Sequence, residues 1–287
     1  MLFELIHWFS DKMNLLEKAF AKLFNNVHVF SFLKNIIQYL VSFALFYNIY
    51  GNANLFTALI GLAGFVIAYQ GVYYYNDIID LAEDKNDEIK KRIKPLARKE
   101  VLAEFYVIKI FVYMIFGLLL CFAVSWVFGA LVIGTLFLNF IHSTPRIRLK
   151  KTPFVGINFF LLQFLKFSSG WVALASTQQL LEIPVYVIGL FAAAYTLGYL
   201  VYKKNNLHPK KILREKPVNI SLFAVLAFAF LILSFLQYNF KAQIIILFAS
   251  SFLFLVPIKS SSMRRVISGS AISLLVYALF IISLLFL

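Results

Sequence analysis

Long apolar runs recur along this chain, and short polar segments with most of its charge separate them. A run of about 18 or more apolar residues is long enough to cross a bilayer as a helix. A spanning backbone must satisfy its hydrogen bonds internally, and these continuous runs lack the alternation of membrane β-strands. We therefore predict an all-α integral membrane protein whose nine spans lie at about residues 36–50, 54–75, 104–122, 123–141, 154–175, 182–202, 217–237, 241–258 and 266–286.

The segment before the first span has a different pattern. Residues 1–30 contain acids and no long apolar run, so they do not read as a cleavable signal. Their apolar residues recur at helical spacing, which predicts an amphipathic helix lying in the membrane interface. We therefore divide the chain into an N-terminal amphipathic interfacial segment, residues 1–30, and a nine-helix transmembrane domain, residues 31–287.

Charge fixes the expected orientation of the helices. The net charge is +14, and all but three of the 27 Lys and Arg lie in the N-terminal segment and in alternate loops. Positive residues collect on the cytoplasmic side, so we expect the N-terminus and the basic loops inside and the C-terminus outside. Topology and anionic membrane lipids explain the basic excess without nucleic acid. The single cysteine, Cys121, excludes an internal disulfide.

Acidic residues gather in one stretch, the aspartate motif, which we define as Asn76 to Asp84. Of the 13 Asp and Glu, six fall between Asp77 and Glu88, directly after an apolar span. A helix turns by about 100° per residue, so Asn76, Asp77, Asp80 and Asp84 are expected on one face. Oxygen ligands so arranged suit a hard divalent cation such as Mg²⁺, and the Lys and Arg that follow suit phosphate. The alternative is a solvated loop of mixed charge.

Two segments carry a resemblance to a known family. Asn76-Asp77-x-x-Asp80-x-x-x-Asp84, followed by Lys-Pro-Leu at 94–96, resembles the first aspartate-rich motif of the UbiA-type intramembrane prenyltransferases. The segment from His142 to Lys150 is similar to that family's Tyr-Ser-x-Pro-x-x-Arg-Leu-Lys segment. The resemblance implies a nine-helix UbiA-like bundle, with residues 31–287 as a prenyltransferase-like domain. It also implies Mg²⁺-dependent transfer of an isoprenyl group from a prenyl diphosphate to an aromatic or other lipophilic acceptor.

The residue pattern and the resemblance together indicate roles for particular residues. Metal ligands are Asn76, Asp77, Asp80 and Asp84, and the catalytic residues are Asp77, Asp80 and Lys166. Diphosphate-binding residues are Lys91, Arg92, Arg148, Lys203 and Lys204, and pocket residues are Tyr73, His142, Asn158 and Tyr199. Lys166 lies inside a span, where a charge is costly and usually faces a cavity or a partner. Tyr73 and His142 could instead occupy the membrane interface, and Asn158 could serve helix packing.

One feature departs from the family. The family's second aspartate-rich motif is expected after the sixth span, but that region contains Lys203-Lys204 and no acid. A basic pair at this place resembles the polyprenyl-phosphate phosphoribosyltransferase branch, although that branch's following Glu is absent. The alternatives are therefore transfer from phosphoribosyl diphosphate to a polyprenyl phosphate, or lipid binding without catalysis. A transporter is disfavoured, because the polar cluster lies at the membrane margin rather than at the midplane.

Overall fold

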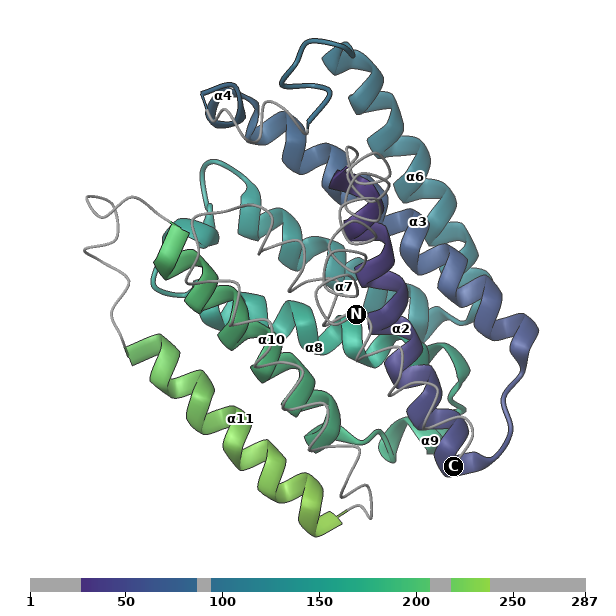
Figure 1. Cartoon of the computed structure of the whole chain (residues 1–287). Helices are drawn as coiled ribbons and strands as arrows, with labels where there is room; N and C mark the ends of the chain where they lie inside the picture. Colours follow the sequence, from purple (N-terminus) through teal and green to yellow (C-terminus); the bar gives the residue numbers. More distant parts are fainter. Residues whose placement is uncertain (1–26, 87–93, 207–217, 238–287) are drawn as a thin grey trace, which may run out of the picture.

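The computed structural model describes residues 27–86, 94–206 and 218–237, and the regular elements within these ranges are all helical (Figure 1). The sequence prediction of an all-α fold is confirmed for this part of the chain. The helices are α2 (Val27–Tyr50), α3 (Leu55–Ile79), α4 (Leu81–Asp84), α6 (Ala103–Val124), α7 (Trp126–Ser143), α8 (Val155–Leu174), α9 (Thr177–Leu181), α10 (Val185–Asn206) and α11 (Val218–Gln237), with a short 3₁₀ turn, η1 (Leu149–Lys151).

The first seven predicted spans each coincide with one of these helices, α2, α3, α6, α7, α8, α10 and α11. Five helices of the described part are long and apolar enough to cross a membrane: α3, α6, α7, α8 and the Ile220–Gln237 portion of α11. The expected break between the third and fourth spans lies at Ser125, whose hydroxyl caps α7 by accepting the N–H of Phe128 at 3.1 Å. The last two predicted spans and residues 1–26 lie outside the described residues.

The start of α2 differs from the sequence prediction. The first apolar run was expected to begin near residue 36, with the polar pair Lys34 and Asn35 preceding it, but α2 begins at Val27. The expected boundary at residue 30 therefore falls inside a helix. Asn35 and Gln38 are buried because they find polar partners inside the bundle. Hydropathy misses such positions, since it scores side chains without their partners.

Glycines allow close contacts between helices of the bundle. The helices α3 and α6 pack along each other (Figure 1), and a Cβ on Gly117 would lie 2.2 Å from the backbone nitrogen of Ala68. Across the same interface, a Cβ on Gly64 would lie 2.9 Å from the sulfur of Cys121. A Cβ on Gly170 of α8 would lie 2.2 Å from the carbonyl oxygen of Tyr39 on α2. Small residues allow this backbone approach in membrane helices.

Gly117→Ala tests the α3–α6 contact. The added methyl group meets backbone rather than a movable side chain, so the free energy of unfolding is expected to fall by about 1–3 kcal/mol. Reversible unfolding in detergent micelles measures the change. Gly134→Ala in α7 is the matched control, because its Cβ would meet only Leu165 at 3.7 Å. Equal stability of the two variants would contradict a close contact at Gly117.

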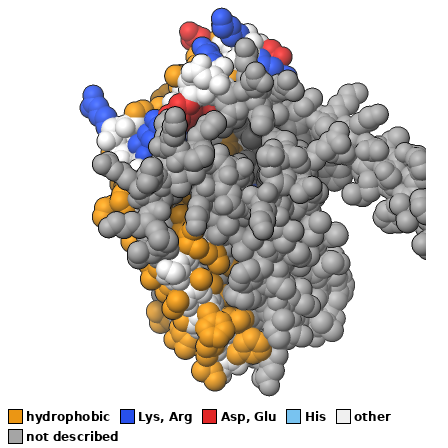
Figure 2. Space-filling view, turned by 60° about the vertical axis from the view of Figure 1, so that its left-hand side comes forward, with side chains coloured by type: hydrophobic (Ala, Val, Ile, Leu, Met, Phe, Trp, Pro, Cys, Tyr) orange, Lys and Arg blue, Asp and Glu red, His pale blue; other side chains and the backbone are white. Residues whose placement is uncertain are grey.

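The outer surface of the bundle fits a lipid environment. Along α6 many large apolar side chains are exposed, among them Phe105, Ile108, Phe111, Ile115, Phe116 and Leu119. In the face shown in Figure 2, the coloured Lys, Arg, Asp and Glu side chains gather at one end and hydrophobic side chains cover the region below them. The charged end contains the aspartate motif at the end of α3, so the site lies at the polar rim of an apolar bundle.

Candidate active site

The aspartate motif follows the end of α3 into the short helix α4. Asp80 forms the junction with φ −91° and ψ 2°, which interrupts the regular helix after Ile79. The backbone N–H of Asp80 still donates to the carbonyl of Asn76, and that of Asp84 donates to the carbonyl of Asp80. The motif therefore keeps a near-helical register, and its side chains leave the chain in different directions along it.

Asp77 and Asp84 share one cation, the ammonium group of Lys94. The Lys94 nitrogen lies 2.9 Å from Asp77 Oδ1 and 2.6 Å from Asp84 Oδ2. Both acids are buried, with 5% and 0% of their surface exposed. Burial alone would lower the pKa of Lys94, but the Asp77 and Asp84 carboxylates outweigh it and raise the pKa above its ordinary value. A positive charge is thus held between two buried carboxylates.

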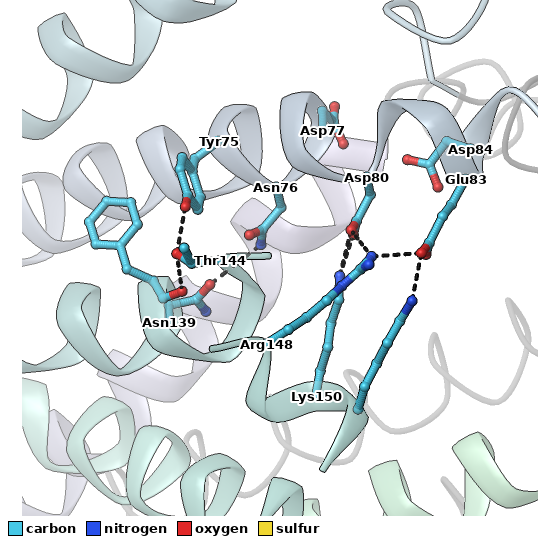
Figure 3. A network of polar contacts seen from close by, with 12 residues as sticks. Tyr75, Asn76, Asp77, Asp80, Glu83, Asp84, Asn139, Thr144, Arg148 and Lys150 are labelled. Atoms are coloured by element: carbon cyan, nitrogen blue, oxygen red, sulfur yellow. Dashed lines mark hydrogen bonds and ion pairs between the residues drawn. The ribbon is translucent and has the colours of Figure 1, made fainter. Parts of the chain in front are cut away.

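Asp80 and Glu83 face a different set of cations, on the segment between α7 and α8 (Figure 3). Lys150 donates to both oxygens of Asp80 at 2.6 Å, and Arg148 lies 3.2 Å from one of them. Arg148 also lies 2.8 Å from Glu83, which Lys151 contacts at 2.6 Å. The hydrogen bond from Lys151 and the Arg148 charge outweigh burial and lower the pKa of Glu83 to about 2.

The backbone of Arg148 has an unusual conformation. Its φ of 38° lies in the left-handed region, which costs a residue other than glycine about 1–2 kcal/mol. The ion pairs to Asp80 and Glu83 offset part of this cost.

Burial lowers the pKa of the neighbouring Lys150, although the Asp80 carboxylate acts in the opposite direction. A strained, basic loop held against an acidic motif is typical of a binding site.

Amides connect the start of the motif to the centre of the bundle. The Asn76 Nδ2 group donates to Asn139 Oδ1 at 3.4 Å, and Asn139 donates to the hydroxyl of Tyr69 at 2.5 Å. Next to them, the hydroxyls of Tyr75 and Thr144 lie 2.6 Å apart (Figure 3). Within the described part of the chain, the buried Oδ1 of Asn76 accepts no hydrogen bond. An amide oxygen in this state is a suitable ligand for a hard cation.

The four expected metal ligands do not meet at one point. Asp77 and Asp84 surround Lys94, whereas Asp80 turns to Lys150 and Asn76 turns to Asn139. In the ranges described, no three His, Cys, Asp or Glu side chains converge as metal ligands. Two carboxylates around a cation, with the Asn76 amide oxygen on the same motif, are nevertheless a donor set that fits Mg²⁺, which also accepts water ligands. The ammonium group of Lys94 lies between the Asp77 and Asp84 carboxylates, as a bound cation would.

Three of the expected pocket residues form one cluster. Asn158 Nδ2 lies 3.0 Å from Nδ1 of His142, and both side chains are buried. Tyr199 on α10 stacks on Phe159 with ring centres 4.0 Å apart, and its ring centre lies 6.3 Å from that of His142. The hydroxyl of the fourth, Tyr73, accepts from Asn35 Nδ2 at 3.1 Å. Lys34 lies 5.9 Å from the ring centres of both Tyr73 and Tyr195, and the Tyr195 ring centre is 6.2 Å from that of Phe159, so Tyr73 is connected to the cluster through Lys34 and Tyr195.

The remaining expected site residues are five basic residues, and the structure describes the side-chain contacts of Lys166. Lys166 is buried against Asn35 and Tyr69 and, among the described residues, makes no ion pair with the motif. Lys203 and Lys204 lie in the last turn of α10, and Lys91 and Arg92 lie outside the described residues. Their phosphate-binding roles stay predictions.

Sequence reasoning placed Lys94 only among the basic residues that suit phosphate, and it assigned no individual site role to Lys150 or Asn139. Lys94 and Lys150 belong to the two segments that carry the family resemblance, so a signal existed for both. Asn139 is one amide inside an apolar run, and its partners on α3 are 63 and 70 positions away in the chain. No local pattern in the sequence indicates that contact.

Comparisons with known proteins agree with this architecture. The model of the UbiA prenyltransferase family matches residues 37–211. A search of curated proteins finds no match. A solved UbiA homolog from Archaeoglobus fulgidus bound to DMAPP and Mg²⁺ superposes with a TM-score of 0.68 at 17% identity, covering 91% of this chain and 98% of that one.

Two further solved structures have the same fold. A UbiA homolog from Archaeoglobus fulgidus bound to GPP and Mg²⁺ gives a TM-score of 0.67 at 18% identity, with 92% of this chain and 99% of that chain covered. A digeranylgeranylglyceryl phosphate synthase gives 0.59 at 18% identity, with 94% and 99% covered. At these identities the likeness concerns the fold.

Proposed function

The chain belongs to the UbiA prenyltransferase family, and on this basis we propose that it transfers an isoprenyl group from a prenyl diphosphate to an aromatic or lipid-precursor acceptor within the membrane. It is a multi-pass integral membrane protein. The observation that carries the proposal is the pair of buried carboxylates, Asp77 and Asp84, around one cation beside the basic loop of Arg148 and Lys150. We place this charged end on the cytoplasmic side, because the basic loops lie there.

We propose that Asp77, Asp84 and the amide oxygen of Asn76 hold Mg²⁺ once Lys94 has moved aside. Bound Mg²⁺ supplies positive charge that stabilises the diphosphate as it leaves. Two structures with this fold contain Mg²⁺ together with DMAPP or GPP, which supports the assignment. Asp80 is proposed to act by orienting Lys150 and Arg148, which both donate to its carboxylate.

The basic side chains have a direct task. Arg148 and Lys150 now contact carboxylate oxygens, and both exchange these for phosphate oxygens when the donor binds, since the two acceptors have similar geometry. Lys91, Arg92, Lys203 and Lys204 are proposed to add positive charge. The carbon–oxygen bond of the allylic diphosphate then breaks, the bonding electrons leave with the diphosphate, and the surrounding helices keep water from the allylic cation. The acceptor attacks this carbon and loses a proton.

A second candidate is phosphoribosyl transfer to a polyprenyl phosphate. It is favoured by the basic pair Lys203-Lys204, which stands where the family's second acidic motif is expected. The same first motif and basic loop would then hold the diphosphate of phosphoribosyl diphosphate. The two candidates differ in the group that is transferred, so an assay with labelled donors separates them.

The test is a transfer assay in membranes that contain the protein. With ¹⁴C-labelled prenyl diphosphate and Mg²⁺, label is expected to enter a lipophilic product, and EDTA should abolish this transfer. Membranes without the protein are the control. If label enters the lipid fraction from phosphoribosyl diphosphate and never from prenyl diphosphate, the second candidate replaces the first. No transfer from either donor, with lipophilic acceptors supplied, would indicate a lipid-binding homologue.

A further inference from the structure

A single amide on α7, that of Asn139, connects two side chains of α3. Its Oδ1 accepts from Asn76 Nδ2 at 3.4 Å, and its Nδ2 donates to the hydroxyl of Tyr69 at 2.5 Å (Figure 3 shows the contact with Asn76). Tyr69 and Asn76 lie about two turns apart on α3, so they share one face of that helix. Asn139 is buried between them.

An amide inside an apolar span needs hydrogen-bond partners, because burying it without them is costly. Asn139 stands between Leu138 and Phe140 in α7. Packing of α7 against α3 accounts for its bond to Tyr69. It does not account for the bond to Asn76, because the oxygen of Asn76 is buried and accepts no hydrogen bond within the described residues. The second bond therefore calls for another explanation.

The contact with Asn139 fixes which end of the Asn76 amide faces α7. An amide has a nitrogen that only donates and an oxygen that only accepts. If the Asn76 amide turned over, its oxygen would face the oxygen of Asn139, and two acceptors repel each other. The nitrogen of Asn76 therefore faces Asn139. Its oxygen, the atom proposed as a metal ligand, is directed away from α7 and stays available.

Tyr69 fixes the amide of Asn139 in the same way. The hydroxyl of Tyr69 takes the nitrogen end of this amide, which leaves the oxygen end for Asn76. The ring of Tyr69 is buried, and its centre lies 6.0 Å from that of Phe65 and 5.4 Å from that of Tyr73. A ring held by such neighbours keeps its hydroxyl in place. Orientation thus passes from Tyr69 through Asn139 to Asn76.

We propose that Asn139, held by Tyr69, is a positioning residue of the metal site and directs the oxygen of Asn76 toward the bound cation. This inference rests on the proposed function, in which that oxygen is a metal ligand, and it adds two side chains from outside the aspartate motif. Removing a partner that orients a metal ligand typically lowers metal affinity by about 10–100-fold. The bond of 3.4 Å is at the long end for a hydrogen bond, so it orients the amide without holding it tightly.

The experiment measures Mn²⁺ binding to the purified protein in nanodiscs of phosphatidylcholine by electron paramagnetic resonance. Mn²⁺ prefers the same oxygen ligands as Mg²⁺ and gives a signal when free. Asn139→Leu keeps the approximate size of the side chain and should lower the Mn²⁺ affinity at least about tenfold. Thr135→Val is the matched control, because Thr135 is buried one turn earlier and its hydroxyl donates to the carbonyl of Leu131 in the same helix. It should change the affinity less than twofold.

A second background separates positioning from a general effect on the fold. If Asn139 acts through Asn76, the two substitutions are not additive. Asn76→Ala alone should weaken Mn²⁺ binding, and adding Asn139→Leu to it should weaken binding less than twofold further. A loss of similar size in both backgrounds would identify Asn139 as a packing residue and overturn the proposal. An unchanged affinity of the single Asn139→Leu variant would overturn it as well.

Tyr69→Phe tests the other end of the connection and serves if Asn139→Leu does not fold. It removes one hydroxyl and leaves the ring, so the helices should pack as before. The Mn²⁺ affinity should fall at least about threefold, because the amide of Asn139 loses the bond that orients it. Tyr39→Phe is the control: Tyr39 is equally buried, but its hydroxyl donates to the carbonyl of Ala58. Equal affinities of these two variants would overturn the proposal.

The binding measurements require no turnover, so they separate this inference from the proposed function. Normal Mn²⁺ binding with the expected losses, but no transfer from a prenyl diphosphate, would support the positioning role and contradict the transferase. Transfer by the unmodified protein, together with additive losses, would contradict the positioning role alone. An unmodified protein that binds no Mn²⁺ would overturn both the metal site and the role of Asn139.

Discussion

Asp77→Asn is expected to lower Mg²⁺-dependent transfer by at least about 100-fold. Asp77 is buried at the end of α3 and, with Asp84, surrounds the ammonium group of Lys94. Asparagine keeps the size of the side chain but removes one of the two negative charges that would hold the metal. The ion pair between Lys94 and Asp84 remains, so the variant should fold.

Initial rates at several Mg²⁺ concentrations measure this loss. Higher Mg²⁺ should restore part of the rate if the lost charge served the metal. The matched control is Glu100→Gln, which removes an exposed carboxylate that pairs with Arg98 at 2.8 Å. Its rate should stay within about twofold of the unmodified protein, since an exposed pair contributes little. An Asp77→Asn variant with more than a third of the original rate would contradict the assignment of Asp77.

Lys94→Met is expected to make folding depend on Mg²⁺. Without metal, Asp77 and Asp84 lose the cation that lies 2.9 and 2.6 Å from them. Removing one partner of a buried ion pair costs about 3–5 kcal/mol, because the remaining charge stays buried. The free energy of unfolding in EDTA should fall by about that amount. Mg²⁺ should restore most of it, since Lys94 no longer competes for the two carboxylates.

Unfolding of the variant and the unmodified protein, each in EDTA and in excess Mg²⁺, gives the four values needed. Lys85→Met serves as the control, because Lys85 is exposed and follows Asp84 directly in the chain. It should change stability by less than about 0.5 kcal/mol in both solutions. A Lys94→Met protein as stable in EDTA as the unmodified protein would show that Lys94 does not neutralise this pair.

The sequence predicted the spans better than the contacts of the site. Apolar runs indicate helices whatever surrounds them, so seven predicted spans coincide with described helices. Helical geometry also placed Asp77 and Asp84 about 20° apart, in agreement with their shared contact to Lys94. Asp80 and Asn76 were expected on the same face at about 60° and 100° away. Rotations of that size aim a side chain at another helix or loop, and Asp80 reaches Lys150 instead.

The contacts of Lys166 show a different limit. A charge inside an apolar run predicts a polar partner, but the run does not identify it. The partner, Asn35, lies 131 positions earlier, in a segment whose polar residues read as the flank of a span. Only the packing of α2 against α8, through Gly170, brings the two together. Long-range contacts between single polar residues have no periodic signal in a sequence.

The ion pairs of the motif have a consequence for how substrates bind. In the described part of the chain, these pairs join four acids, Asp77, Asp80, Glu83 and Asp84, to four bases, Lys94, Arg148, Lys150 and Lys151. A metal ion alone would add positive charge to this neutral set, and a diphosphate alone would add negative charge. When both bind, the metal pairs with the acids and the diphosphate pairs with the bases, so each added charge is compensated by the other. Metal and donor should therefore bind with positive heterotropic cooperativity, each raising the affinity for the other by the same factor.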